Sequence, residues 1–139
     1  MGNVKGVFVN LTAHRLLPEQ VRAIKEDLGI EEIVDAEEVV PKGLLEKLRQ
    51  CPADPKELFR MACELSDALV KYTRENGVDL YVHLPCGSPA FMWCFANVFP
   101  HKFISAVFSH TKREVVETQQ PDGSVVKKSV FKFEKFIVF

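Results

Sequence analysis

The stretch Asp79-Leu-Tyr-Val-His-Leu84, followed directly by Pro85-Cys-Gly-Ser-Pro89, decides the fold class of this chain. The first part is a short apolar run of the kind that forms a strand buried on both faces. The second part is a turn that contains glycine, and its Ser-Pro ending is typical of the start of a helix. A strand that turns directly into a helix is the unit from which parallel α/β sheets are built.

The rest of the chain repeats this alternation. Apolar runs predict three further strands, at Val4 to Asn10, Ile30 to Asp35 and Phe103 to Phe108. Helical patterns begin at Leu17, cover Leu44 to Arg49, run from Asp54-Pro55 to Asn76, and begin again at Ser88-Pro89. The length of the crossover helices suggests the strand order two-one-three-four, with right-handed crossovers between the parallel strands.

Two alternating runs near the end of the chain predict a hairpin. They are Glu114 to Gln119 and Val125 to Phe133, and the turn sequence Pro121-Asp-Gly-Ser124 joins them. The expected fold is therefore α/β, with a Rossmann-like open parallel sheet, flanking helices and a C-terminal antiparallel hairpin. We expect residues 1–139 to form a single domain.

Composition excludes several classes of function. A chain that is 47% hydrophobic and 27% charged is typical of a soluble protein, and no apolar run reaches the roughly 20 residues of a membrane span. The first residues lack the pattern of a signal peptide, which predicts a cytoplasmic location. Four cysteines without a Cys-x-x-Cys pair indicate reduced thiols and no metal site. A net charge of −1 argues against a long nucleic acid as partner.

The strand ends indicate where a ligand would bind. Polar or basic residues follow the first, third and fourth predicted strands, at residues 11–15, 85–89 and 109–113. Because the carboxyl ends of parallel strands emerge at one edge of a sheet, these segments are expected to meet there. Basic residues crowd the last quarter of the chain, so the sequence predicts a site for a small anionic ligand.

The loop after the first strand has the groups that phosphodiester chemistry needs. Asn10, Thr12, His14 and Arg15 supply an amide, a hydroxyl, an imidazole and a guanidinium within six residues. Such a set can hold a phosphodiester, move a proton and stabilise developing negative charge. The alternative is a solvated loop in which His14 merely precedes a helix.

The loop after the third strand offers backbone N–H groups at a helix start. Gly87 would let an anion approach the backbone, and Ser88 would cap the helix or donate to the ligand. The alternative is that both residues only form the turn and the cap. Cys86 in this position is also a candidate nucleophile. His83 is expected to be an interior histidine with satisfied hydrogen bonds rather than a catalyst.

The segment after the fourth strand combines cations with hydroxyls: Ser109, His110, Thr111, Lys112 and Arg113. Lysine is a mobile point charge, whereas arginine is a fork that matches phosphate oxygens. The alternative is a solvated, charged start of the hairpin. The phenylalanines of the last strand are expected in the core or in a dimer contact more than in stacking on bases.

These segments resemble a known family. The polar turn before Leu17-Pro-Glu-Gln20, the Gly87-Ser88 turn, and above all Thr111-Lys-Arg-Glu114 with Pro121-Asp-Gly-Ser124 resemble small stand-alone CRISPR-associated proteins. These are the Rossmann-like CARF-type proteins that bind cyclic oligoadenylates, and some are ring nucleases. The resemblance implies a homodimer that binds cyclic oligoadenylate, often the tetra-adenylate, with no cofactor. In active members a ribose 2′-hydroxyl attacks the neighbouring phosphate without a metal.

The resemblance leads to one hypothesis and leaves two alternatives open. The leading hypothesis is a metal-independent ring nuclease that switches off type III CRISPR signalling. Its catalytic residues would be His14, Arg15 and Lys112. Its ligand-binding residues would be Asn10, Thr12, Cys86, Gly87, Ser88, Ser109, His110, Thr111 and Arg113. One alternative is a sensor or sponge that holds the same ligand without cutting it, and the other is an unrelated α/β enzyme that uses Cys86.

Overall fold

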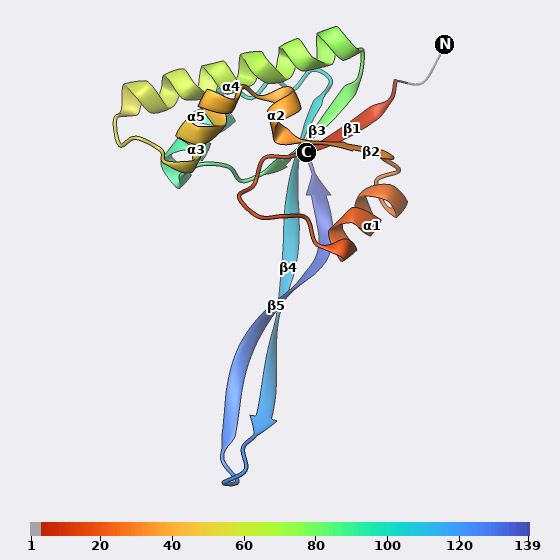
Figure 1. Cartoon of the computed structure of the whole chain (residues 1–139), viewed down its shortest axis with the longest axis vertical. Coiled ribbons are helices and arrows are strands. Elements are labelled where there is room, and N and C mark those ends of the chain that lie inside the picture. The colour runs from red at the N-terminus through yellow and green to blue at the C-terminus, as the bar shows by residue number, and fades with distance from the viewer. Residues whose placement is uncertain (1–3) are drawn as a thin grey trace.

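One five-stranded sheet, in the order β2-β1-β3-β4-β5, organises the computed structural model, which describes residues 4–139 (Figure 1). Its strands are β1 Gly6–Asn10, β2 Glu32–Val34, β3 Asp79–Leu84, β4 Ile104–Gln119 and β5 Val125–Val138. The first four strands are parallel, and β5 is antiparallel to β4. The predicted α/β fold class and strand order are confirmed.

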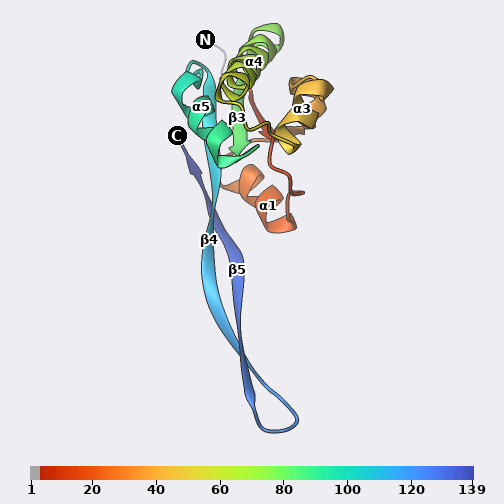
Figure 2. The ribbon, with the colours of Figure 1, turned by 90° about the vertical axis from the view of Figure 1, so that its left-hand side faces the viewer.

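Helices cover both faces of this sheet. They are α1 Pro18–Glu26, α2 Ala36–Val39, α3 Lys42–Arg49, α4 Pro55–Asn76 and α5 Pro89–Val98. Alternate residues of β1 separate the two layers, because Val7 and Val9 join the core with α3, α4 and α5, whereas Phe8 packs with Ile24 of α1. Figure 2 shows α1 apart from the other helices. Alternation along one buried strand therefore builds two cores.

The long helix α4 has the bounds that the sequence predicts. The Asp54 carboxylate caps its start by accepting the Glu57 N–H at 3.1 Å, and Gly77 ends it with a positive φ of 60°. Its side chains Met61, Leu65 and Leu69 are almost fully buried against the sheet. The helix thus packs as one layer on the sheet of the head, which we define as residues 4–109.

The C-terminal hairpin differs from the prediction. The sequence predicts a fourth strand that ends at Phe108 and a polar loop over residues 109–113, but β4 continues without a break to Gln119. β5 pairs with it from Val125 to Val138, with one irregularity between His110 and Thr111. Lysine and arginine are compatible with a strand whose two faces are exposed to solvent. The length of β4 therefore depends on its hydrogen bonds to β5, which continue to Gln119. The result is a two-stranded arm that projects beyond the helices (Figures 1 and 2).

Helix α5 is less buried than its apolar sequence predicts. Phe91 and Phe95 are buried, but Trp93 is 75% exposed. The short helix α2 was not predicted, since four residues carry too weak a periodicity to be recognised. Over residues 4–139, we find no helix with the length and apolar character that crossing a bilayer requires.

Candidate functional site

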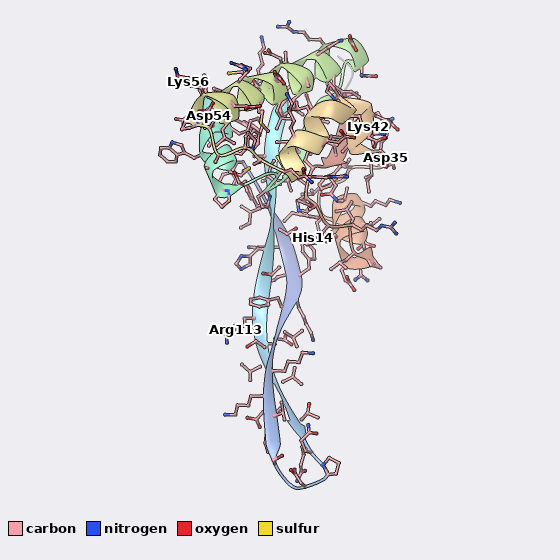
Figure 3. The ribbon with its side chains drawn as sticks, turned by 60° about the vertical axis from the view of Figure 1, so that its left-hand side comes forward. His14, Asp35, Lys42, Asp54, Lys56 and Arg113 are labelled. Atoms are coloured by element: carbon pink, nitrogen blue, oxygen red, sulfur yellow. The ribbon has the colours of Figure 1, made fainter. Side chains whose placement is uncertain are left out.

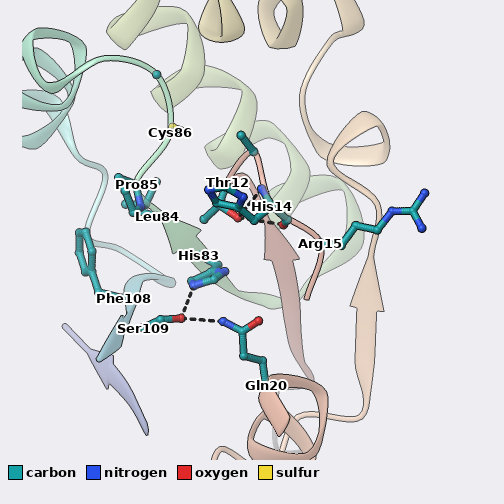
Figure 4. A pocket seen from close by; sticks show the side chains of 12 residues that line it. Thr12, His14, Arg15, Gln20, His83, Leu84, Pro85, Cys86, Phe108 and Ser109 are labelled. Atoms are coloured by element: carbon teal, nitrogen blue, oxygen red, sulfur yellow. Dashed lines mark hydrogen bonds between the residues drawn. The ribbon is translucent and has the colours of Figure 1, made fainter. Parts of the chain in front are cut away.

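A pocket of about 370 Å³ lies at the carboxyl ends of β1 and β3, beside Phe108 and Ser109 of β4 (Figure 4). It is lined by the loop after β1, the end of β3 with its following turn, Phe108 and Ser109 of β4, and Gln20 of α1. The lining residues are Thr12, Ala13, His14, Arg15, Gln20, His83, Leu84, Pro85, Cys86, Gly87, Phe108 and Ser109. This is the topological switch point, where the chain runs outward from β1 to either side and α/β proteins commonly bind ligands.

A second hollow of about 430 Å³ adjoins the first. The two share Thr12, Ala13 and Gly87, and the second is also lined by Asn10, Ser88, Arg49 and Cys51 among others. The loop after β1 therefore stands between two depressions at the same edge of the sheet.

A buried histidine joins three strands at the floor of the pocket. His83 Nδ1 lies 2.9 Å from Asn10 Oδ1, and its Nε2 lies 2.7 Å from Ser109 Oγ. Gln20 Nε2 donates to the same Ser109 oxygen at 3.0 Å (Figure 4). Neighbouring register explains the first contact, because Asn10 pairs with His83 across the parallel β1–β3 ladder.

The surrounding hydrogen bonds fix which nitrogen of His83 carries the proton. Asn10 Nδ2 donates to the His14 carbonyl at 2.7 Å, and Asn10 Oδ1 accepts the Thr12 N–H at 3.1 Å and the Thr12 hydroxyl at 2.6 Å. The Asn10 oxygen therefore faces His83, so Nδ1 of His83 is the donor. Nε2 is left as the acceptor, and Ser109 donates its hydroxyl proton to it.

Gln20 completes the chain from the opposite side. Its Oε1 accepts the Leu17 N–H at 2.7 Å, which turns the amide nitrogen toward Ser109. Ser109 Oγ thus accepts from Gln20 and donates to His83. Ser109 is thus a hydroxyl next to a base, His83, and Asn10 orients that base.

Burial determines the charge of this histidine. His83 is only 4% exposed and packs beside the rings of Phe8 and Phe136, with ring centroids 5.7 and 5.4 Å away. This desolvation lowers the pKa of His83 to about 4. The imidazole is therefore neutral at pH 7 and keeps Nε2 as a proton acceptor. The expectation of a satisfied interior histidine is confirmed, and the same residue lines the pocket.

Burial has the opposite effect on the neighbouring thiol. Cys86 is 4% exposed, and desolvation, with a smaller contribution from Cys51, raises its pKa to about 12. A nucleophilic cysteine must be a thiolate at working pH, and this environment disfavours that form. The structure therefore argues against the enzyme hypothesis that uses Cys86.

The turn after β3 is built for close packing. Gly87 has a φ of 71°, and a Cβ there would lie 2.9 Å from a ring carbon of Phe91 and 3.0 Å from Cys51 Sγ. Ser88 Oγ accepts the Phe91 N–H at 3.1 Å, and the Ser88 N–H donates to Cys51 Sγ at 3.2 Å. Ser88 is therefore the N-cap of α5, which is the structural alternative that the sequence left open.

The structure brings together only part of the predicted site. Thr12, His14, Arg15, Cys86, Gly87 and Ser109 line the first pocket, and Asn10 and Ser88 line the adjoining hollow. His110, Thr111, Lys112 and Arg113 line neither, because β4 carries them away from the sheet edge as part of the arm. Figure 3 shows Arg113 on the arm, well away from His14.

The prediction that residues 109–113 form a loop is therefore wrong, since all five lie in β4, and of the five only Ser109 lines the pocket. Arg113 instead donates to Ser129 on the facing strand, through Nε at 3.1 Å and Nη2 at 2.9 Å. Lys112 stands opposite Lys132 on the exposed ladder. In this single chain, neither the predicted catalytic role of Lys112 nor the predicted ligand contacts of His110, Thr111 and Arg113 have a place in the pocket.

The sequence analysis did not identify two residues of the hydrogen-bond network at the pocket, Gln20 and His83. Gln20 is 89 residues from Ser109 in the chain, and no sequence pattern announces their contact. His83 had a signal, since it stands one residue before the end of its strand, as a polar group in an apolar run. Between residues 4 and 139, no set of three or more His, Cys, Asp or Glu side chains is placed to hold a metal.

Comparison with known protein families gives a match over most of the chain. A model of a family described as the uncharacterized protein MJ1673 family matches residues 6–137. Neither the curated proteins nor the solved structures give a match to this chain.

Replacing Gly87 tests the packing of the turn. We expect Gly87→Ala to lower the free energy of unfolding by about 1–3 kcal/mol, because alanine at positive φ is strained and its Cβ would press on Phe91. Gly43, in helix α3 with no atom near its Cβ position, is the matched control, and Gly43→Ala should leave stability equal or slightly higher. Denaturant unfolding of both variants measures the difference; equal effects would contradict this description of the turn.

The buried histidine predicts how stability depends on pH. Because the folded pKa of His83 is about 4 and the usual value is 6.5, the unfolded chain binds a proton in this interval and the folded chain does not. Stability should therefore fall as the pH drops from 6.5 to 4, by about 3 kcal/mol from this residue.

Urea unfolding at several pH values measures this slope. His83→Gln should be less stable at pH 7 and should lack the His83 part of the slope. The control His101→Gln, at an exposed position, should keep it. A slope that survives in His83→Gln would show that other groups cause the acid sensitivity.

Proposed function

The chain belongs to the uncharacterized protein MJ1673 family, and we propose that its pocket binds and cleaves a cyclic oligoadenylate, in the first place cyclic tetra-adenylate, without a metal. The observation that carries this proposal is an exposed imidazole and a hydroxyl hydrogen-bonded to a neutral base in one pocket, with Arg15 among the residues that line it. These are the groups that hold a phosphodiester and transfer its protons. The choice of ligand rests on the sequence resemblance.

Arg15 and the turn before α5 would hold the phosphate. Arg15 is exposed and lines the pocket, and its guanidinium points away from His83 and Ser109 in Figure 4. It would turn toward a bound ligand to form paired hydrogen bonds with phosphate oxygens. Gly87 lines the same pocket just before the helix start, where the positive end of the α5 dipole favours an anion. The negative charge would thus lie between a cation and a helix terminus.

His83 and Ser109 would supply the base. In the proposed step a ribose 2′-oxygen bonds to the adjacent phosphorus as the bond from phosphorus to the 5′-oxygen breaks, which leaves a 2′,3′-cyclic phosphate. The 2′-hydroxyl proton passes to Ser109 Oγ while the Ser109 proton passes to His83 Nε2. His14 donates a proton to the departing 5′-oxygen, and Arg15 stabilises the phosphorane charge.

The ligand itself would make His83 a better base. In the free protein, burial keeps the pKa of His83 low because nothing offsets the loss of hydration. A bound phosphodiester brings a negative charge to the pocket and favours the protonated imidazole. The pKa of His83 therefore rises when the substrate is present, toward the range in which general bases work.

The size of the pocket supports a shared site. A volume of about 370 Å³ is at the lower end of the range for small-ligand pockets, so one chain would enclose only part of a four-nucleotide ring. The proposal therefore includes a homodimer in which two pockets face one ring. It also includes a cytoplasmic location, because this class of messenger is made inside the cell.

Mass spectrometry tests the activity directly. The protein is incubated with cyclic tetra-adenylate in excess chelator, and linear products that end in a 2′,3′-cyclic phosphate are expected. Intact ligand recovered in a tight complex would instead support the sensor or sponge alternative. Absence of binding would reject both.

Variants locate the site. We expect Arg15→Ala to weaken ligand binding at least tenfold, whereas Arg60→Ala, an exposed arginine on α4 outside the pocket, should not change it. His83→Gln should lower the rate of cleavage more than it weakens binding, since Nε2 is needed as a proton acceptor. Equal losses of binding in Arg15→Ala and Arg60→Ala would place the ligand elsewhere.

A further inference from the structure

The arm is the feature that the proposed function does not use. We define the arm as Thr111–Gln119 of β4, the turn at residues 120–124, and Val125–Phe133 of β5. At the rise of a strand it is about 30 Å long. The helices of the head do not cover it, as both views show (Figures 1 and 2).

This arm exposes apolar side chains, which a two-stranded ribbon surrounded by solvent does not need for its stability. Val115, Val116, Val125, Val126 and Phe131 are between 43% and 68% exposed. An isolated two-stranded ribbon is marginally stable in water, and its unpaired outer edges invite contact with other chains. An exposed apolar arm of this kind therefore indicates a protein partner.

Strand alternation divides the arm into two faces. Lys112, Val116, Val126 and Lys128 share one face, since the ladder pairs Lys112 with Lys132, Val116 with Lys128 and Thr118 with Val126. Within residues 4–139, neither Lys112 nor Lys128 forms an ion pair, whereas Lys127 and Lys132 are paired with Glu117 and Glu114. This face, the lysine face, thus combines valines with two cations that have no partner.

Charge is divided unevenly between the arm region and the head. Residues 110–139 hold six Lys and Arg and four Asp and Glu, a net charge of +2. Residues 1–109 hold twelve basic and fifteen acidic residues, a net charge of −3, which accounts for the −1 of the whole chain. One copy's arm is therefore complementary in charge to another copy's head.

The head has a groove that fits this complement. It has a volume of about 720 Å³ and lies between α4 and the segment that contains α2 and α3. Its charged lining comprises Glu37, Glu38, Glu64, Asp67, Glu75, Lys47 and Lys71, so acids outnumber cations. Ala68 and Tyr72, which are partly exposed, add apolar surface for valine side chains.

We propose that the lysine face of the arm docks into the acidic groove of a second copy of this chain, and that the second copy returns the contact. Two such contacts are needed to approach the roughly 1,200–2,000 Å² that stable interfaces bury. Pairing of arm with arm is disfavoured, because it would bring together two segments of net positive charge. This inference identifies the surface behind the homodimer of the proposed function, but it does not depend on any ligand.

Mass measurement of the ligand-free protein is the first test. Light scattering coupled to gel filtration should give twice the chain mass of 15.8 kDa at micromolar concentration. An arm-shortened variant, in which Asn-Gly joins Lys112 to Lys132, should be folded and monomeric, since the buried core clusters contain no residue of the arm. A monomeric wild type, or a shortened variant that stays dimeric, would overturn the proposal.

A charge exchange tests the docking site without removing the arm. Lys112→Glu with Lys128→Glu should raise the dimer dissociation constant at least tenfold, and so should Glu37→Lys with Glu38→Lys. Combining all four substitutions should restore association, because the attraction is reversed at both surfaces. The control Trp93→Ser, at an exposed apolar position of α5, should remain dimeric. Failure of the combined variant to recover would overturn the groove as the docking site.

The two proposals fail in different ways. If the protein is dimeric through the arm but neither binds nor cleaves cyclic tetra-adenylate, the proposed function is rejected and the arm contact stands. If it cleaves the ligand as a monomer, the arm contact is rejected and the pocket chemistry stands.

Discussion

The parallel pairing of β1 with β3 is the constraint on which the rest of the structure depends. It places Asn10 beside His83, and the Leu11 N–H extends the ladder by donating to the His83 carbonyl at 3.1 Å. The alternation of β1 sends Val7 and Val9 to one core and Phe8 to the other. A slip of one residue would exchange the two cores and separate the amide from the imidazole. Stability and site geometry therefore depend on one register.

The polar chain at the pocket floor has an order because every member has only one satisfactory orientation. The His14 carbonyl fixes the amide of Asn10, Asn10 fixes the tautomer of His83, and the Leu17 N–H fixes Gln20. A buried polar group without a hydrogen-bond partner lowers the stability of the fold. Loss of any one member of this hydrogen-bond network would therefore be destabilising. The hydrogen bonds that stabilise this part of the fold also direct the Ser109 hydroxyl toward the neutral imidazole of His83.

The sequence predicted those features of the fold that depend on interactions between residues close together in the chain. The bounds of α4 follow from the cap at Asp54, the glycine stop and a regular apolar face, and the length of the crossover helices suggested the strand order that the sheet has. The end of β4 could not be predicted, because hydrogen bonds from β5 continue the strand through Lys112 and Arg113. The contact of Gln20 with Ser109 also escaped prediction, since it depends on how α1 packs across the sheet.

The unbroken course of β4 has a mechanical consequence. Ser109 is two residues before the start of the arm on the same strand, and the irregularity in the β4–β5 ladder falls between His110 and Thr111. A bend of the arm would therefore concentrate at this irregularity, next to the hydroxyl that links His83 to Gln20. At a bulge the ladder is locally disrupted, and the strand bends and twists more strongly than elsewhere. The direction in which the arm leaves the sheet is therefore set within two residues of Ser109.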